Sequence, residues 1–124
     1  NGKVDILRVN RKYLEEFNWR INEKSLIEGD PMRFFDEENK AKYLNMLQEA
    51  IESGNEAECE TWRTYEATDG TPERLCIRTT VRVVGEDGGN HFLFYSMIRN
   101  ITEEKKRLEE LLEIEKQFKK INNQ

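Results

Sequence analysis

The chain has 124 residues, a formal net charge of −5 at pH 7 and 36% charged residues. This length fits one domain that can bury a substantial core, and the acidic balance argues against nucleic acid or an anionic membrane as the main partner. No run of about 18 apolar residues occurs, so the sequence predicts no transmembrane helix.

The first third of the chain is predicted to contain one strand and short helices. Apolar residues recur in 3–10 as in a short strand, and in 11–18 as on the inward face of a short helix. A single helical turn is expected at 22–27, because the Gly and Pro that follow within 28–31 stop helices.

A longer helix is predicted next, beginning at about Asp36. This residue is a suitable N-cap, and apolar residues such as Tyr43 and Leu47 then recur at helical spacing. Gly54 suits the left-handed conformation that commonly ends a helix, so we expect the helix to end within Ser53-Gly54-Asn55.

The second half of the chain is predicted to be antiparallel sheet, with strands at 57–68, 74–84 and 91–99. Apolar and polar residues alternate in the second strand, which indicates one packed and one solvated face. Phe92–Ile98 is apolar at nearly every position, so we expect both of its faces to be covered, as in a central strand. A sheet whose helices are segregated to one face is an α+β architecture.

The two cysteines are predicted to be free thiols. In a hairpin of 57–68 with 74–84, Cys59 lies opposite about Arg82, and Cys76 lies roughly 20 Å away along the strand. A disulfide needs Cα atoms within about 7 Å. Because the sequence also opens without a secretory signal, we expect a cytoplasmic protein.

The last strand runs without a loop into a charged helix, which is predicted from Asn100 to about Ile121. The Asn100 side chain can cap this helix while Glu103 reaches back to the Asn100 backbone, as in a capping box. A buried strand joined rigidly to a protruding helix can carry a change in the core to a partner. We therefore predict that Asn100, Ile101 and Thr102 form a relay.

This exit helix carries an apolar stripe with the alternating spacing of a coiled-coil seam. The stripe consists of Leu111, Ile114, Phe118 and Ile121. Acidic residues open the helix and basic residues close it, which is the order that the helix dipole favours. The stripe predicts a homodimer or a relay to a following domain, and the alternative is that it folds back on its own sheet.

The order of these elements resembles that of a PAS domain over about 3–115. The motifs that are similar to those of the family are Arg8-Val9-Asn10-Arg11, Ser25-Leu26-Ile27-Glu28-Gly29-Asp30, Asp36-Glu37-Glu38, Asp69-Gly70 and Asn100-Ile101-Thr102-Glu103-Glu104-Lys105. The resemblance implies a sensory domain at 1–101, with short helices on one face of an antiparallel sheet, and a signalling helix at 102–124.

One element of the PAS fold is missing, because the sequence begins at the family's second strand. The absent first strand is central, and without it the edge of Phe92–Ile98 would be unpaired and apolar, which is costly. Three explanations are open: a partner chain supplies the missing strand, residues 3–9 occupy its place, or the sequence was cut so that the strand is not included. We predict that 3–9 pairs with Phe92–Ile98 or that a neighbouring chain fills the gap.

Enzyme and metal motifs are absent from the sequence. It has no Gly-x-Ser-x-Gly, no phosphate-binding Gly-rich loop with Lys-Ser/Thr and no His-Glu-x-x-His, and His91 is its only histidine. We therefore expect neither catalysis nor a metal site. By resemblance, a covalent flavin needs a helical Cys and a haem needs a helical His. Cys59, Cys76 and His91 are all predicted on strands, so neither cofactor is expected.

A non-covalent ligand is the remaining kind of site, and the resemblance implies that it lies between the sheet and the short helices. The candidate lining residues are Phe17, Trp19, Leu47, Ile51, Trp62, Arg63, Ile77, Thr79, Phe94 and Ser96. Thr79 and Ser96 interrupt apolar strands and can bind a polar group. Alternatively, Ser96 packs against a bulky neighbour, Thr79 bonds a main-chain group, and the tryptophans belong to the core.

The sequence thus predicts a PAS-like sensory and dimerisation module of a larger bacterial signal-transduction protein. The resemblance implies a diguanylate cyclase, cyclic-di-GMP phosphodiesterase or histidine kinase as the output domain. The alternative is a ligand-free adaptor that spaces or dimerises neighbouring domains. A cavity lined by Thr79 and Ser96 would favour sensing, whereas a filled core would favour the adaptor.

Overall fold

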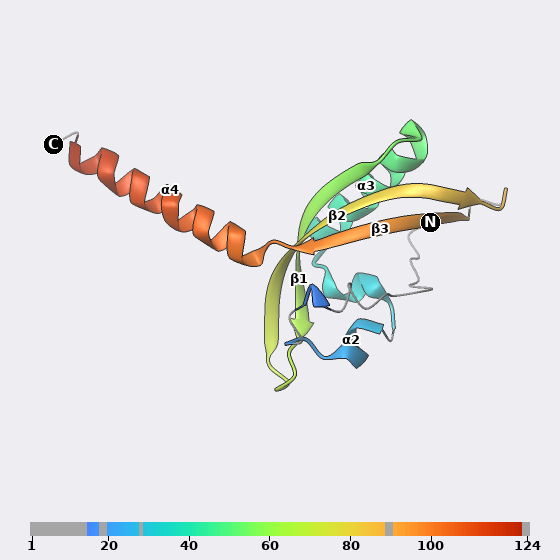
Figure 1. Cartoon of the computed structure of the whole chain (residues 1–124), viewed down its shortest axis with the longest axis horizontal. Helices are drawn as coiled ribbons and strands as arrows, with labels where there is room; N and C mark the ends of the chain where they lie inside the picture. Colours follow the sequence, from blue (N-terminus) through green and yellow to red (C-terminus); the bar gives the residue numbers. More distant parts are fainter. Residues whose placement is uncertain (1–14, 18–19, 28, 89–90, 123–124) are drawn as a thin grey trace.

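The structure, a computed structural model, describes residues 15–17, 20–27, 29–88 and 91–122 (Figure 1). Its helices are α2 (Glu23–Ile27), the 3₁₀ helix η1 (Pro31–Phe34), α3 (Glu37–Ser53) and α4 (Thr102–Asn122). Its strands are β1 (Ala57–Glu66), β2 (Pro72–Glu86) and β3 (Phe92–Asn100). The described residues therefore form an α+β fold, as predicted, while the strand predicted at 3–10 lies outside them.

Strands β1 and β2 form a long antiparallel hairpin, whose last pair is Glu66 opposite Pro72. The turn between them lies two residues earlier than expected, at 67–71, because β1 ends at Glu66 and β2 begins at Pro72. Gly70 adopts a φ of 85° in this turn, a left-handed conformation that glycine reaches without a steric cost.

The earlier turn changes the predicted register of the two cysteines. Cys59 lies opposite Thr79 and not opposite Arg82, so Cys76 is three residues along the strand from the position facing Cys59. That spacing corresponds to roughly 10 Å, which still exceeds the reach of a disulfide. Both thiols are free, as predicted.

Strand β3 lies at the edge of the sheet among the described residues, because the strand order is β1–β2–β3. Phe94 and Ile98 are half-buried on the face that the helices cover. The other face of β3 exposes about half of the side chains of Leu93, Tyr95 and Met97. The prediction that both faces of Phe92–Ile98 are covered is therefore wrong. The predicted pairing of 3–9 with this strand lies outside the described residues.

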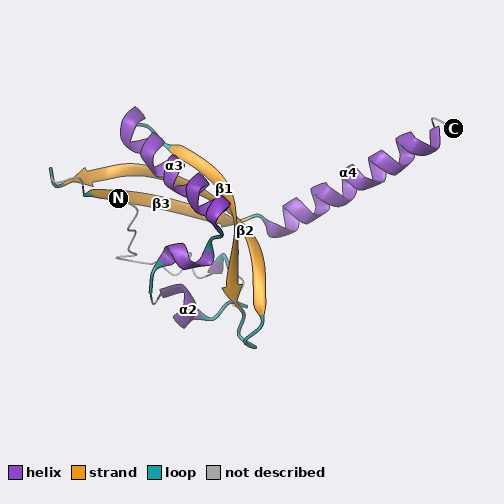
Figure 2. Ribbon diagram, turned by 180° about the vertical axis from the view of Figure 1, so that it is seen from behind, coloured by secondary structure: helices purple, strands orange, loops and turns teal. Residues whose placement is uncertain are grey.

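Helix α3 begins and ends at the predicted residues. The Asp36 carboxylate accepts a hydrogen bond from the backbone N–H of Asn39 at 2.8 Å, which makes Asp36 the N-cap. Gly54 ends the helix with a φ of 71°, and its N–H donates to the carbonyl oxygen of Ala50. These local signals fix the length of the helix that lies along the sheet (Figure 2).

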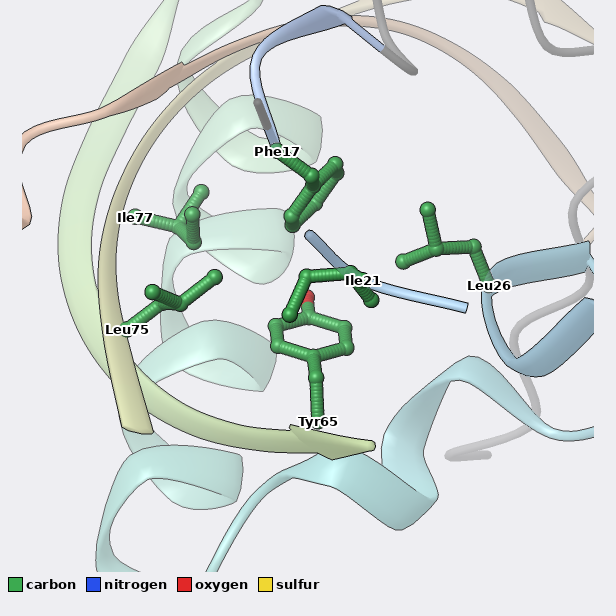
Figure 3. Packing of buried hydrophobic residues seen from close by; sticks show 6 residues of the cluster. All are labelled: Phe17, Ile21, Leu26, Tyr65, Leu75 and Ile77. Carbon is green, nitrogen blue, oxygen red and sulfur yellow. The ribbon is translucent and has the colours of Figure 1, made fainter. Parts of the chain in front are cut away.

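The core lies on one face of the sheet and consists of two clusters of buried residues. One cluster, at the end of the sheet covered by α2 and η1, contains Phe17, Ile21, Leu26, Tyr65, Leu75 and Ile77 (Figure 3). The other cluster, under α3, contains Met46, Leu47, Ala50, Ala57 and Val81. The opposite face of the sheet carries charged side chains and the exposed apolar residues of β3.

Candidate functional site

The clearest candidate site is the junction at which β3 passes into α4. After β3 ends, the Ile101 N–H donates to the carbonyl oxygen of Cys76 at 2.9 Å, and the Cys76 N–H donates to the Thr102 hydroxyl at 2.9 Å. Strand β2 therefore keeps hydrogen bonds to the chain as it enters the helix. Ile101 is only 1% exposed and Thr102 is also buried, so both predicted relay residues are held inside the domain.

Asn100 arranges this junction in a different way from the predicted capping box. Its side-chain oxygen accepts hydrogen bonds from the Thr102 N–H at 3.1 Å and from the Thr102 hydroxyl at 2.5 Å. Its own N–H donates to the Glu16 carboxylate at 2.9 Å, and not to Glu103. The helix begins at Thr102, so Ile101 occupies the N-cap position and Asn100 precedes it. The capping-box prediction is therefore wrong.

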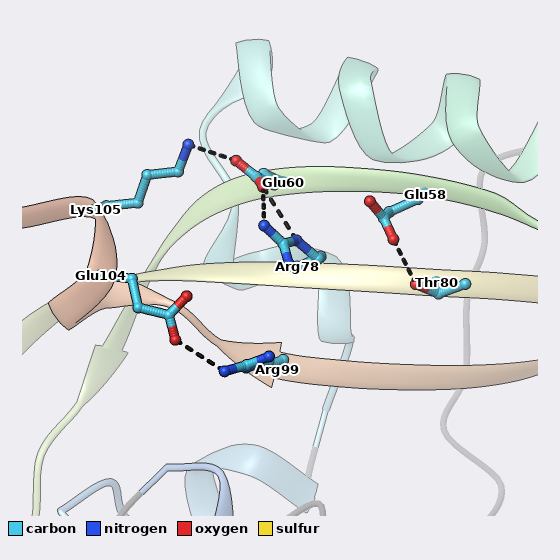
Figure 4. Close-up of polar contacts among 7 residues, drawn as sticks. All are labelled: Glu58, Glu60, Arg78, Thr80, Arg99, Glu104 and Lys105. Atoms are coloured by element: carbon cyan, nitrogen blue, oxygen red, sulfur yellow. Dashed lines mark hydrogen bonds and ion pairs between the residues drawn. The ribbon is translucent and has the colours of Figure 1, made fainter. Parts of the chain in front are cut away.

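Charged side chains add a second connection between the sheet and α4 (Figure 4). Glu60 of β1 forms ion pairs with Arg78 of β2 at 2.9 Å and with Lys105 of α4 at 2.6 Å. The hydrogen bond from Lys105, and then those from Arg78, lower the pKa of Glu60. Arg99 of β3 pairs with Glu104 of α4 at 3.1 Å. All three strands are thus linked, directly or through Glu60, to the first turn of the helix.

Beyond this first turn, α4 projects away from the sheet (Figures 1 and 2). Every side chain from Lys106 to Ile121 is exposed. The predicted stripe is among them, with exposed fractions from 63% to 68% for Leu111, Ile114, Phe118 and Ile121. The alternative in which the stripe folds back on its own sheet is therefore wrong for this structure.

A second candidate site is the buried guanidinium of Arg63, which is only 6% exposed. It donates hydrogen bonds to the hydroxyl groups of Thr61 at 3.1 Å, Tyr65 at 3.2 Å and Thr79 at 2.9 Å. Thr79 therefore bonds the Arg63 side chain, and the alternative in which it bonds a main-chain group is wrong.

Two aromatic rings also lie near the Arg63 guanidinium. Arg63 lies 4.5 Å from the centroid of the Phe35 ring and 5.6 Å from that of Tyr43. Cation–π contact stabilises a desolvated arginine of this kind. Burial raises the pKa of Tyr43. This effect is larger than that of the nearby Arg63 charge, which lowers the pKa.

The structure brings some of the predicted lining residues together and separates others. Arg63 contacts Thr79, while Phe17 and Ile77 belong to the core cluster under α2 and η1. Leu47 belongs to the core cluster under α3, against which Phe94 packs, and Ile51 of the same helix is half-buried.

Two of the predicted lining residues lie away from the buried residues on the helix-covered face of the sheet. Trp62 alternates with Thr61 and Arg63 along β1, so it lies on the opposite face of the sheet, where Arg74 stands over its ring at 5.4 Å. Ser96 is exposed. Trp19 lies outside the described residues.

No hollow that we identify in the described residues is lined by Thr79 or Ser96. A hollow of about 70 Å³ lies beside the junction and is lined by Phe17, Arg20, Ile21, Glu73, Leu75, Asn100, Thr102, Glu103 and Lys106. A wider and more open one borders Tyr65 and Pro72. Thr79 instead contacts the buried guanidinium of Arg63.

Sequence reasoning found Asn100, Ile101 and Thr102 but missed the residues that hold them. Glu16 is separated from Asn100 by 84 positions, and Glu60 carries no motif that would mark it. The charge of Lys105 was visible in the sequence, but its partner on β1 was not. No local signal could have identified these contacts, because they depend on the twist of the sheet and the direction of α4.

Within the part of the chain that the structure describes, His, Cys, Asp and Glu side chains form no group able to hold a metal ion. None of the described helices is both long and apolar enough to span a membrane. No protein-family model matches the chain, and a search of curated proteins finds no relative.

Proposed function

We propose that this chain is a PAS-like sensory and dimerisation module of a larger cytoplasmic signal-transduction protein. The observation that carries the proposal is the junction, in which the Thr102 hydroxyl joins the β2 backbone to the start of a protruding helix. The exposed stripe on that helix offers a surface to a second copy of the chain. By resemblance, the output domain is a diguanylate cyclase, a cyclic-di-GMP phosphodiesterase or a histidine kinase.

The mechanism is a change of helix position driven by the sheet. A shift of β2 relative to β3 moves the Cys76 backbone, to which both Ile101 and Thr102 are hydrogen-bonded. Because Glu60 and Arg99 hold the first turn of α4, the same shift changes the direction of the helix. A few kcal/mol of differential binding between two such arrangements is enough to move the population from one to the other.

The second candidate function is a ligand-free adaptor that spaces or dimerises neighbouring domains. It is favoured by the packing around Thr79, whose hydroxyl is already bonded to the buried Arg63. A ligand at this position has to displace that contact or move the α3 side chains. Both functions use the same helix, and they differ in whether a small molecule sets its position.

Native mass spectrometry of the purified protein tests both functions, because one spectrum reports subunit number and retained small molecules. A dimer with an added defined mass supports the sensory module, and a dimer of the bare chain supports the adaptor. A monomer at all accessible concentrations contradicts the dimerisation module and leaves only an adaptor that spaces neighbouring domains.

Two matched variants show whether any dimer uses the stripe. Phe118→Ser removes a stripe residue that is 64% exposed, and we expect it to shift the population to monomer. Lys116→Ser changes an exposed residue outside the stripe and should leave the dimer unchanged. Equal effects of the two variants would show that the dimer forms elsewhere.

A further inference from the structure

The stripe of α4 carries the four most exposed large apolar side chains among the described residues, with exposed fractions from 63% to 68%. We name Leu111, Ile114, Phe118 and Ile121 the α4 seam. In a heptad repeat, Leu111 and Phe118 occupy the a positions, whereas Ile114 and Ile121 occupy the d positions. The positions beside the seam are then Glu115 on one side and Glu110 on the other.

We propose that α4 binds the α4 of a second copy in the antiparallel orientation, with the sheet domains at opposite ends of the helix pair. This inference rests on the dimerisation in the proposed function and adds the orientation to it. In an antiparallel pair, a residues face d residues of the partner subunit. Leu111 then packs against Ile121 of the partner subunit and Ile114 against Phe118 of the partner subunit, so a single register pairs every seam residue.

The distribution of charge along α4 favours this orientation. In the proposed register the two described helices overlap from Glu110 to Asn122, and within this overlap 110–115 carries three acidic residues and no basic one, whereas 116–122 carries three basic residues and no acidic one. A parallel pair places the two acidic halves side by side and the two basic halves side by side. An antiparallel pair places each acidic half beside a basic half, which is the complementary arrangement.

The flanking positions favour the same orientation. In a parallel pair, the residue at g faces the residue at the following e, so Glu110 meets Glu115 of the partner subunit on both sides of the seam. In the antiparallel register, Glu115 faces only Glu115 of the partner subunit, once, at the centre. Lys119 lies 3.4 Å from Glu115 in the same helix and offsets part of that repulsion.

The shape of the molecule leaves room for this arrangement. Helix α4 points away from the sheet and spans 21 residues, which corresponds to about 31 Å (Figure 1). In the proposed register, Lys116 is level with Lys116 of the partner subunit but at the outward-facing f position, and the last described residue lies beside Glu110. Among the described residues, the overlap of the two helices therefore stops at Glu110, short of the charged junction at Lys105.

Distances between spin labels decide the orientation. A label on Glu103→Cys lies about 40 Å from its copy in the antiparallel pair, but within about 15 Å in a parallel pair. A label on Lys116→Cys is the matched control, because it lies within about 20 Å of its copy in either orientation. Both variants are made with Cys59→Ser, since Cys59 is half-buried and Cys76 is buried.

A long distance at position 103 with a short one at position 116 supports the proposal. Short distances at both positions overturn the antiparallel orientation but leave the dimer of the proposed function intact. The absence of a dipolar signal at position 116 contradicts the dimer itself, and with it both proposals.

Charge substitutions at Glu115 give an independent test, measured as dissociation constants by sedimentation. In the antiparallel pair, Glu115→Gln removes the central repulsion and tightens the dimer about threefold, whereas Glu115→Lys places two lysines together and does not tighten it. In a parallel pair, Glu115→Lys attracts Glu110 of the partner subunit on both sides and tightens the dimer roughly tenfold. Stronger binding by the Lys variant than by the Gln variant overturns the proposal.

Discussion

The Thr102 hydroxyl makes two hydrogen bonds in the junction: it accepts from the Cys76 N–H and donates to the side-chain oxygen of Asn100. We expect Thr102→Val to lower the free energy of unfolding by about 1–3 kcal/mol, since it leaves a buried backbone N–H without a partner. Urea denaturation of the wild type and the variant measures this difference. Thr80→Val is the matched control, because the Thr80 hydroxyl bonds the Glu58 side chain at the surface. A loss as large for Thr80 as for Thr102 would contradict the bridging role.

Arg63 is the other residue whose geometry is specific, because its planar guanidinium reaches three hydroxyl groups and faces the Phe35 ring. Lysine keeps the charge but lacks the forked donors, so we expect Arg63→Lys to lower the free energy of unfolding by about 1–3 kcal/mol. Arg74→Lys, at a half-exposed arginine above Trp62, should change it by less than about 0.5 kcal/mol. Similar unfolding midpoints for the two variants would show that the buried network contributes little.

The first turn of α4 is held to the sheet by an ion pair whose strength depends on pH. The pKa of Glu60 is lowered in the folded chain, so the unfolded chain binds more protons and stability rises with pH. The contribution is fully present above the unfolded pKa of Glu60 and is lost as pH falls through the lowered folded value. We expect Glu60→Gln to destabilise the protein at pH 7 and to have little effect at pH 2.

Urea midpoints of the wild type and Glu60→Gln across this pH range measure the effect. Glu58→Gln is the control, because the Glu58 carboxylate accepts only from Thr80 among the described residues. A difference between wild type and Glu60→Gln that stays constant down to pH 2 would show that the ionised pair with Lys105 and Arg78 is not its cause.

At the scale of elements, local chemistry was enough to predict α3 but not the surroundings of β3. Asp36 and Gly54 lie beside the helix that they cap, so their roles are visible in the sequence. Strand β3 is apolar on both faces, yet Tyr95 and Met97 are half exposed, because burial depends on which elements cover the sheet. The composition of the segment predicts that a strand forms, but it does not predict which elements cover the faces of that strand.

The junction between β3 and α4 likewise shows what local sequence signals can and cannot predict. The motif that begins at Asn100 predicted a helix start within two residues of the observed one. The direction of the Asn100 N–H could not be predicted, because its acceptor is Glu16, on a segment far away in the sequence. Motifs therefore located the candidate site, whereas the residues that stabilise it required the three-dimensional structure.

The molecule as a whole combines a packed domain with a helix that has few supporting contacts. The side chains of α4 are exposed from Lys106 onward, and a lone helix without tertiary packing is only marginally stable in water. A partner that covers the α4 seam must then supply much of the stability of this helix. The hairpin of β1 and β2 needs no such partner, because Tyr65, Leu75 and Ile77 are buried within one chain.

This difference predicts that dilution affects the helix and the sheet separately. We expect the amide protons of Leu108–Ile121 to lose protection from hydrogen exchange when the protein is diluted below the dissociation constant of the dimer. The amides of β1 and β2 should keep their protection at every concentration. Phe118→Ser should expose the helix amides even in concentrated samples, whereas Lys116→Ser should behave like the wild type. Helix protection that is independent of both concentration and Phe118 would mean that α4 is stable alone, and that its apolar seam is not what orders it.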